Sequence, residues 1–299
     1  MTLFYRQQCW ISTISLFLLL FVQLLTGQPQ LPEKVAIAKF THTAPQIDGL
    51  VDEVWLEITP RDSFVQREPY QGELSSAQTK FYILHDEKNL YLLFIMLDDE
   101  PQTIPARLVE RDQDFYPDDH ISFYLDTYND LRRAYLFSTN PAGVERDGLI
   151  SENGSNIDYT WDAVFNVVAR RNNYGWVAEF SIPFTSLRFT DDLRYQIWGF
   201  NVWRVRKKYR EISYWSLVKQ DYQMVRLDQG GALIGMQNLH SGHHLDILPY
   251  ATARNIKQPE NQETDADFGI DLKYGLTSDL TLDATVNPDF GHVEIDEEQ

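Results

Sequence analysis

The chain contains a succession of short segments rich in β-branched and aromatic residues, and turn signals separate each segment from the next. TKFYILH at 79–85 and LYLLFIML at 90–97 are joined by the four-residue turn 86–89 and predict a β-hairpin. From about residue 35 onward, no long apolar pattern with a helical period of 3.6 residues interrupts these segments. Strands are further predicted at 121–126, 133–140, 163–170, 175–182, 197–205 and 211–217.

About eight strands at this spacing predict an all-β fold, an antiparallel β-sandwich of the jelly-roll type. The segment 182–187 is the exception, because Pro183 ends a strand and is well suited to begin a short helical turn. The 299 residues, 43% of them hydrophobic, are enough for one sizeable core and the start of a second unit.

Residues 1–27 have the features of a secretory signal peptide: Arg6, a run of about a dozen mostly apolar residues, and the small residues Thr26 and Gly27. The apolar run is short for a membrane span, although an uncleaved anchor is the alternative. Both interpretations predict export. The single cysteine, Cys9, precedes the apolar run, so the mature chain would have no disulfide.

The chain has 44 acidic and 26 basic residues, and its net charge is −18. Such a surface repels polyphosphates, so no nucleic-acid partner is expected. The basic cluster at 204–210 (RVRKKYR) lies between two predicted strands and is interpreted as a solvated hairpin tip.

The pattern changes after residue 242, where apolar and polar residues alternate over 268–274 and 280–286. This two-residue period is typical of a transmembrane β-barrel strand and also of an ordinary soluble hairpin. These strands are too few to close a barrel. If they belong to a barrel, we expect it to continue past the sequence given. The predicted organisation is therefore a signal peptide at 1–27, a β-sandwich at 33–239 and the incomplete beginning of an outer-membrane-type β-barrel at 242–299.

Acidic residues follow one predicted strand and precede another. Asp118 and Asp119 are adjacent, and neighbouring residues of a strand point to opposite faces, so they are badly placed to act together as a catalytic pair. Oxygen ligands on loops suit calcium, for which Asp98, Asp99 and Asp118 are the candidate ligands. The alternative interpretation is that these carboxylates are simply solvated turn residues.

Aromatic residues are the second candidate set, because sugar C–H faces stack on aromatic rings. Tryptophans within apolar strands are expected in the core, whereas aromatics at loop edges are expected to be exposed. The first group comprises Trp176, Trp198 and Trp215, and the second comprises Tyr116, Tyr159, Trp161 and Tyr222.

Seven motifs in order resemble the family 9 carbohydrate-binding modules over about residues 35–239. They are the I-D-G at 47–49 with D-E-V-W at 52–55, the hairpin at 79–99, DDHISFYLD, NPAG, GWVAEFSIPFTSL, WGFNVWR and YWS. The ending TLDATVNPDFGHVEIDEEQ is similar to the start of the barrel in bacterial proteins of uncharacterised function that fuse such a module to an outer-membrane β-barrel. The resemblance implies a glycan-binding sandwich with calcium supporting its loops.

In sugar-binding members of that family, two aromatic residues sandwich the sugar, and the resemblance places them near Tyr116 and Tyr222. The positions of a family glutamate and arginine correspond to Ser122 and Ser138 here. The residues that form the fold therefore match the family more clearly than the residues that bind the sugar. Glycan binding is inferred from the fold.

The predicted function is non-catalytic glycan binding by an exported protein of the cell outer membrane, in polysaccharide breakdown or uptake. Tyr116, Trp161 and Tyr222 would stack on the sugar, and Asp118, Asp119 and Arg132 would bind its hydroxyls. One alternative is a glycoside hydrolase that uses Asp118, Asp119 or Glu152. Another is a structural cap or plug of a barrel that binds no sugar.

Overall fold

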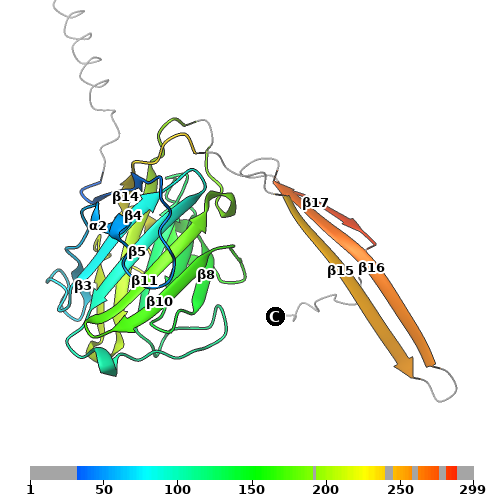
Figure 1. Ribbon diagram of the computed structural model, residues 1–299, viewed down its shortest axis with the longest axis horizontal. Helices are drawn as coiled ribbons and strands as arrows, with labels where there is room; N and C mark the ends of the chain where they lie inside the picture. The colour runs from blue at the N-terminus through cyan, green and yellow to red at the C-terminus, as the bar shows by residue number, and fades with distance from the viewer. Residues whose placement is uncertain (1–31, 191–192, 240–244, 258–261, 276–280, 288–299) are drawn as a thin grey trace, which may run out of the picture.

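A computed structural model describes residues 32–190, 193–239, 245–257, 262–275 and 281–287 (Figure 1). The predicted signal peptide lies outside the described residues. Nearly all regular structure is β-strand, and the α-helix of the described part is the short α2 (Glu53–Leu56). In this part of the chain, no helix is long and apolar enough to span a membrane.

Two sheets form a sandwich, as Figure 1 shows. In the nine-stranded large sheet, seven strands lie side by side and β13 joins β12 to β3. The order is β1 (Val35–Ile37), β14 (Gly231–Ile234), β12 (Trp198–Arg206), β6 (His120–Asp126), β7 (Ala134–Thr139), β8 (Glu145–Ser151) and β9 (Asn156–Asp158), with β13 (Glu211–Tyr214) and β3 (Val65–Glu68) attached.

The five-stranded small sheet has the order β10 (Asn166–Asn172), β11 (Gly175–Pro183), β5 (Asn89–Leu97), β4 (Thr79–His85) and β2 (Lys39–Phe40). Its pairs are antiparallel except for β2 with β4, and in the large sheet β1 with β14 is likewise parallel. The antiparallel β-sandwich predicted from the sequence is therefore confirmed, with two short parallel pairs added where the chain enters the fold.

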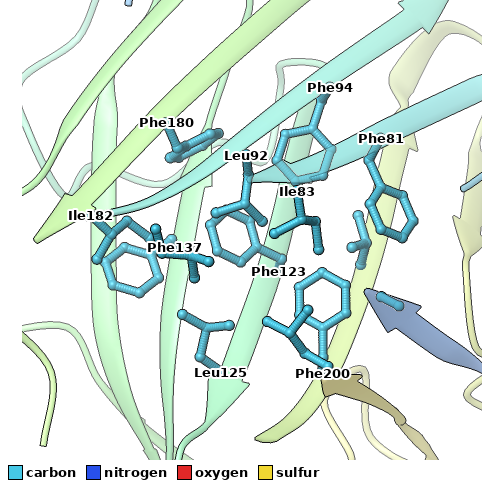
Figure 2. Packing of buried hydrophobic residues seen from close by; sticks show 14 of the residues in the cluster. Phe81, Ile83, Leu92, Phe94, Phe123, Leu125, Phe137, Phe180, Ile182 and Phe200 are labelled. Atoms are coloured by element: carbon cyan, nitrogen blue, oxygen red, sulfur yellow. The ribbon is translucent and has the colours of Figure 1, made fainter. Parts of the chain in front are cut away.

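The main core lies between the two sheets, where phenylalanines from both meet (Figure 2). Phe123 of the large sheet stacks on Phe137 at 5.5 Å between ring centroids and meets Phe180 of the small sheet edge to face at 5.0 Å. Because side chains alternate along a strand, the residues between these phenylalanines point to the outer face of each sheet. The three tryptophans predicted in the core are confirmed there, at 0–2% exposure: Trp176, Trp198 and Trp215.

The predicted strand positions agree with the structure within about three residues at each end. Asn89 begins β5, so the β4–β5 turn is one residue shorter than predicted, and the helical turn after Pro183 is the 3-10 helix η3 (Phe184–Ser186). The pattern missed β1, β2, β3, β8, β9, β14 and the strand at 245–257, and most of these are short, charged or interrupted by glycine.

The interpretation of the basic cluster as a solvated tip is wrong for two of its arginines. Arg204 and Arg206 are at most 1% exposed and lie near Asp98, whose Oδ2 is 2.8 Å from Arg206 Nη2 and 3.6 Å from Arg204 Nη2. A buried charge needs a partner, and Asp98 supplies it. The exposed tip is the 3-10 helix η4 (Lys207–Tyr209).

The remaining 3-10 helices are η1 (Pro101–Thr103), η2 (Glu152–Gly154) and η5 (Leu227–Gln229). Beyond residue 244, β15 (Leu245–Lys257), β16 (Gln262–Gly275) and β17 (Thr281–Val286) form a separate three-stranded antiparallel sheet. The pairs Ile270–Val286 and Leu272–Ala284 place apolar residues on one face of this sheet.

Candidate functional site

The outer face of the large sheet carries a transverse row of residues directly opposite one another on neighbouring strands. Arg146 of β8 pairs with Ser138 of β7, Ser138 with Ser122 of β6, Ser122 with Trp203 of β12, and Trp203 with Tyr214 of β13. Partners in register share a face, and the residues on either side of Ser122 point into the core. These five side chains therefore line one face.

The row, which we call the floor, lies buried beneath the candidate site, since Ser122, Ser138, Trp203 and Tyr214 are 1–5% exposed. Ser138 Oγ donates a hydrogen bond to Ser122 Oγ at 2.8 Å, and the rings of Trp203 and Tyr214 stack at 5.8 Å with 21° between their planes. Both aromatic side chains belong to a second buried cluster, separate from the main core. Its members from the segment that follows β13 are Val218, Val225 and Leu227.

Tyr116 lies before β6, at the end of the face where β12 finishes. Its side chain is 74% exposed, and its backbone N–H donates to Asp114 Oδ1 at 3.1 Å. The Lys207 ammonium lies 3.9 Å from the centre of the Tyr116 ring, a cation–π contact. The exposure predicted for Tyr116 is thus found, with a cation beside the ring.

Asp119 fixes the backbone of Lys207, whose N–H donates to Asp119 Oδ1 at 2.8 Å. The Asp119 side chain is buried, and burial raises the pKa of its carboxyl to about 6 despite this hydrogen bond. Burial also lowers the pKa of the next residue, His120, to about 4, so this imidazole is neutral at pH 7. Lys207 is therefore the cation that lies against the Tyr116 ring at this end of the face.

Tyr222 lies in the segment between β13 and η5 and is 40% exposed. Among the contacts that hold this segment, Arg67 Nη2 donates to the Tyr222 carbonyl at 2.6 Å, and Tyr214 Oη donates to the Met224 carbonyl at 2.6 Å. The Arg226 guanidinium lies 4.7 Å from the Tyr222 ring centre. The floor residue Tyr214 therefore directly supports the segment that presents Tyr222.

Tyr159, not Trp161, brings an aromatic ring to this face from the segment after β9. Tyr159 packs against the second cluster, and the Arg146 guanidinium lies 4.0 Å from its ring centre. Trp161 packs instead against the main core, with its ring 5.0 Å from that of Tyr135. The structure therefore does not place Trp161 beside Tyr116 and Tyr222, because its indole fills an edge of the core.

The acids predicted to bind sugar hydroxyls are buried. Asp118 is 1% exposed, and both of its carboxylate oxygens lie 3.3 Å from Arg107 Nε. Asp119 is 2% exposed and bound to the Lys207 backbone. These carboxylates shape the loops around Tyr116 and do not face solvent, so the prediction of direct hydroxyl contacts is wrong for both.

Arg132 is exposed but lies in the turn after β6, whereas Tyr116 precedes β6. The seven residues of that strand separate the two by about 20 Å. The structure therefore does not bring Arg132 together with Tyr116.

The acids predicted as calcium ligands do not fit a shared ion. Asp98 is paired with Arg206, Asp118 with Arg107, and Asp99 is exposed. Calcium requires six to eight oxygen ligands, and guanidinium groups already hold two of these three carboxylates. Calcium binding by this chain stays a prediction, without a site at these residues.

A different group of three acids does converge in the described part of the chain. Carboxylate oxygens of Asp112, Asp147 and Asp162 lie within 4.8 Å of one another. Arg111 lies among them, 2.7 Å from Asp147, 3.3 Å from Asp112 and 3.4 Å from Asp162. Burial nevertheless raises the pKa of Asp147 to about 6. The arginine already supplies the positive charge that a cation would bring.

A two-sheet sandwich with aromatic rings exposed beside the outer face of one sheet defines a β-sandwich domain of the binding-module type. The chain belongs to the carbohydrate family 9 binding domain-like family, whose sequence profile matches residues 47–210, more than half of the 299 residues. Residues 242–299 match a second family, described as a domain of unknown function, DUF5916. No curated protein matches the chain.

One solved structure shares the fold, and two further ones are similar to this chain. A candidate carbohydrate-binding protein from Bacteroides uniformis is 15% identical, with a TM-score of 0.54 over 68% of this chain and 99% of that one. A family 9 carbohydrate-binding module from Caldicellulosiruptor kristjanssonii, solved with glucose and with cellotriose, is 16% and 17% identical, with TM-scores of 0.45 and 0.46. These matches cover 68% and 69% of this chain and 96% of that one.

Proposed function

We propose that this protein binds carbohydrate, without catalysing its breakdown, on the outer face of the large sheet. The observation that carries the proposal is that Tyr116 and Tyr222, at 74% and 40% exposure, present aromatic rings to solvent from the segment before β6 and the segment after β13 of the large sheet. An exposed ring binds the C–H face of a sugar, and sequence motifs of a carbohydrate-binding family support the same ligand class. The hydrolase alternative is not proposed, because Asp118 is buried and bound by Arg107 and Asp119 is buried and bound by the Lys207 N–H, which leaves Glu152 as the exposed one of its three acids.

Isothermal titration of the protein with a panel of oligosaccharides tests the proposal, together with quenching of tryptophan fluorescence. Tyr116→Ala and Tyr222→Ala should each weaken binding about tenfold or more, because a stacking contact is worth about 1–1.5 kcal/mol. Tyr174→Ala is the matched control, since Tyr174 is also 74% exposed but lies in the β10–β11 turn of the small sheet. Absence of binding across the panel, or equal loss in the control, would refute the proposal.

We further propose that the protein is exported and associates with the outer membrane through residues 242–299, so that the glycan is bound for polysaccharide breakdown or uptake. The support is an exposed apolar face of the three-stranded sheet, on which Phe268, Leu282 and Val286 are 72%, 52% and 60% exposed. Fractionation of cells that produce the protein tests this. Recovery from the soluble fraction alone, or an uncleaved N-terminus within the cytoplasm, would contradict it.

A further inference from the structure

Two cations at the candidate site have no carboxylate to balance them. In the described part of the chain, neither Lys207 nor Arg67 has a carboxylate oxygen within 4.0 Å. The protein as a whole has 44 acidic and 26 basic residues, so acids are the commoner neighbours on its surface. Positive charge without a neighbouring carboxylate beside both exposed tyrosines is therefore not what the acidic composition of the chain would predict.

Arg67 is 6% exposed and lies beneath the segment that presents Tyr222. Its Nη2 donates to the carbonyls of Tyr222 at 2.6 Å and Gln220 at 3.4 Å, whereas its Nε and Nη1 have no hydrogen-bond partner among the described residues. Burial of an unpaired cation costs several kcal/mol, and a negative charge nearby reduces this cost. A ligand with a negative group would supply that charge when it binds.

Lys207 is the cation that stands at the ring of Tyr116. Its backbone is fixed by Asp119, and the contact made by its ammonium is the face of the tyrosine ring at 3.9 Å. An aromatic ring next to an ammonium group can hold the C–H face of a sugar and a negative substituent of the same sugar together. A neutral sugar would use the ring and leave the ammonium unpaired.

Several other charged groups near the face are paired or neutral. Arg146 Nη1 lies 3.4 Å from Asp114 Oδ1, and Arg226 Nη2 lies 2.6 Å from Asp228 Oδ2. His120 is neutral at pH 7, and Asp118 is bound by Arg107. Lys207 beside Tyr116 and Arg67 beneath Tyr222 therefore keep positive charge that no carboxylate of the described residues pairs directly.

We propose that the ligand of this face is an anionic glycan, and that Lys207 binds its carboxylate or sulfate group while Tyr116 stacks on the sugar ring. The proposal rests on the carbohydrate binding proposed above and adds the ligand class and the residue that selects it. Arg67 contributes positive charge from beneath the Tyr222 segment and fixes that segment in place.

Matched pairs of ligands test the proposal on the full chain by isothermal titration. Tetragalacturonate and its methyl ester differ in the carboxylate charge and the ester methyl group, and sulfated and desulfated carrageenan oligosaccharides differ in sulfate. The charged member of one pair should bind about tenfold more tightly, which is about 1.4 kcal/mol. If only the galacturonate pair differs in affinity, the ligand group is a carboxylate; if only the carrageenan pair differs, it is a sulfate.

Lys207→Met removes the charge and keeps an unbranched apolar stem. It should weaken binding of the charged glycan about tenfold and leave the neutral member of the pair unchanged, so the two ligands bind alike. Lys88→Met is the control, because Lys88 is an exposed lysine of the β4–β5 turn on the small sheet. Its affinities should equal those of the wild type.

Equal affinity of the wild-type protein for both members of each pair overturns the proposal, and this comparison needs no variant. Selective binding that Lys207→Met leaves intact overturns the assignment of Lys207. Binding of neutral glycans alone refutes the anionic ligand and leaves the proposed function standing. Absence of binding to every glycan refutes the proposed function as well.

Discussion

The indole N–H of Trp55 donates a hydrogen bond to Glu179 Oε1 at 3.0 Å and joins segments 124 residues apart. The backbone N–H groups of Asp48 and Gly49 donate to the other carboxylate oxygen at 3.1 and 2.8 Å. Glu179 itself is fully buried on β11. One carboxylate therefore fastens the N-terminal segment to the outer face of the small sheet.

Loss of the Glu179 carboxylate should destabilise the sandwich. Glu179→Ala leaves three donors without an acceptor, two of them buried, and we expect the free energy of unfolding to fall by about 3 kcal/mol, with a smaller loss for Glu179→Gln. Urea denaturation followed by tryptophan fluorescence measures both. Glu87→Ala, on the exposed β4–β5 turn, is the control. Equal stability of Glu179→Ala and the control would show that these hydrogen bonds contribute nothing net.

The motifs that carry the family resemblance are explained by this contact. I-D-G at 47–49, the tryptophan of D-E-V-W and the glutamate of G-W-V-A-E meet at one buried point. The sequence showed that these residues belong to the family motifs. It could not show that they contact one another, because a contact between residues more than 120 positions apart leaves no local sequence pattern. Their position on the small sheet, away from Tyr116 and Tyr222, indicates a structural role.

The fold was largely predictable because β-branched and aromatic residues recur at strand spacing. β8 was not predicted, because E-R-D-G-L-I-S contains charged residues and a glycine. The position of Arg146 beside Ser138 could therefore not be predicted either. Tyr116 and Tyr222 were predictable as exposed loop aromatics. Lys207 was not, because which residues of the basic cluster are buried depends on distant acids such as Asp98.

The phenylalanine core should be sensitive to truncation. Phe123 is fully buried and contacts Phe94, Phe137, Phe180 and Phe200, so Phe123→Ala creates a cavity between the sheets. We expect it to lower the free energy of unfolding by about 3–5 kcal/mol. Val164→Ala should change it by less than about 0.5 kcal/mol, since Val164 is 78% exposed. Similar midpoints in urea for the two variants would contradict the core described above.

Arg67 should hold the Tyr222 segment without stabilising the fold as a whole. Arg67→Met removes the hydrogen bond to the Tyr222 carbonyl, so trypsin should cleave after Lys219 several-fold faster. The free energy of unfolding should change by only about 1 kcal/mol, because two guanidinium nitrogens are unpaired in the wild type. Arg171→Met, at an exposed position of β10, is the control. An unchanged cleavage rate would contradict the anchoring role.

Asp119 should make stability depend on pH. Its folded-state pKa of about 6 lies above the ordinary value of 3.8, so between pH 4 and 6 the folded state binds more protons than the unfolded state. The stability that this group contributes is therefore present below pH 4 and is lost as the pH rises through 6.

Asp119→Asn keeps an acceptor for the Lys207 N–H and removes the titration. The free energy of unfolding of the wild type, minus that of the variant, should fall by up to about 3 kcal/mol between pH 4 and 7. Burial raises the pKa of Asp126 and of Asp147 to about 6 as well, but both titrate in each protein and cancel in the difference. Exposed Asp99→Asn is the control. A difference that does not vary with pH would mean that Asp119 is ionised throughout, held so by Arg204 and Arg206, whose charges lower its pKa.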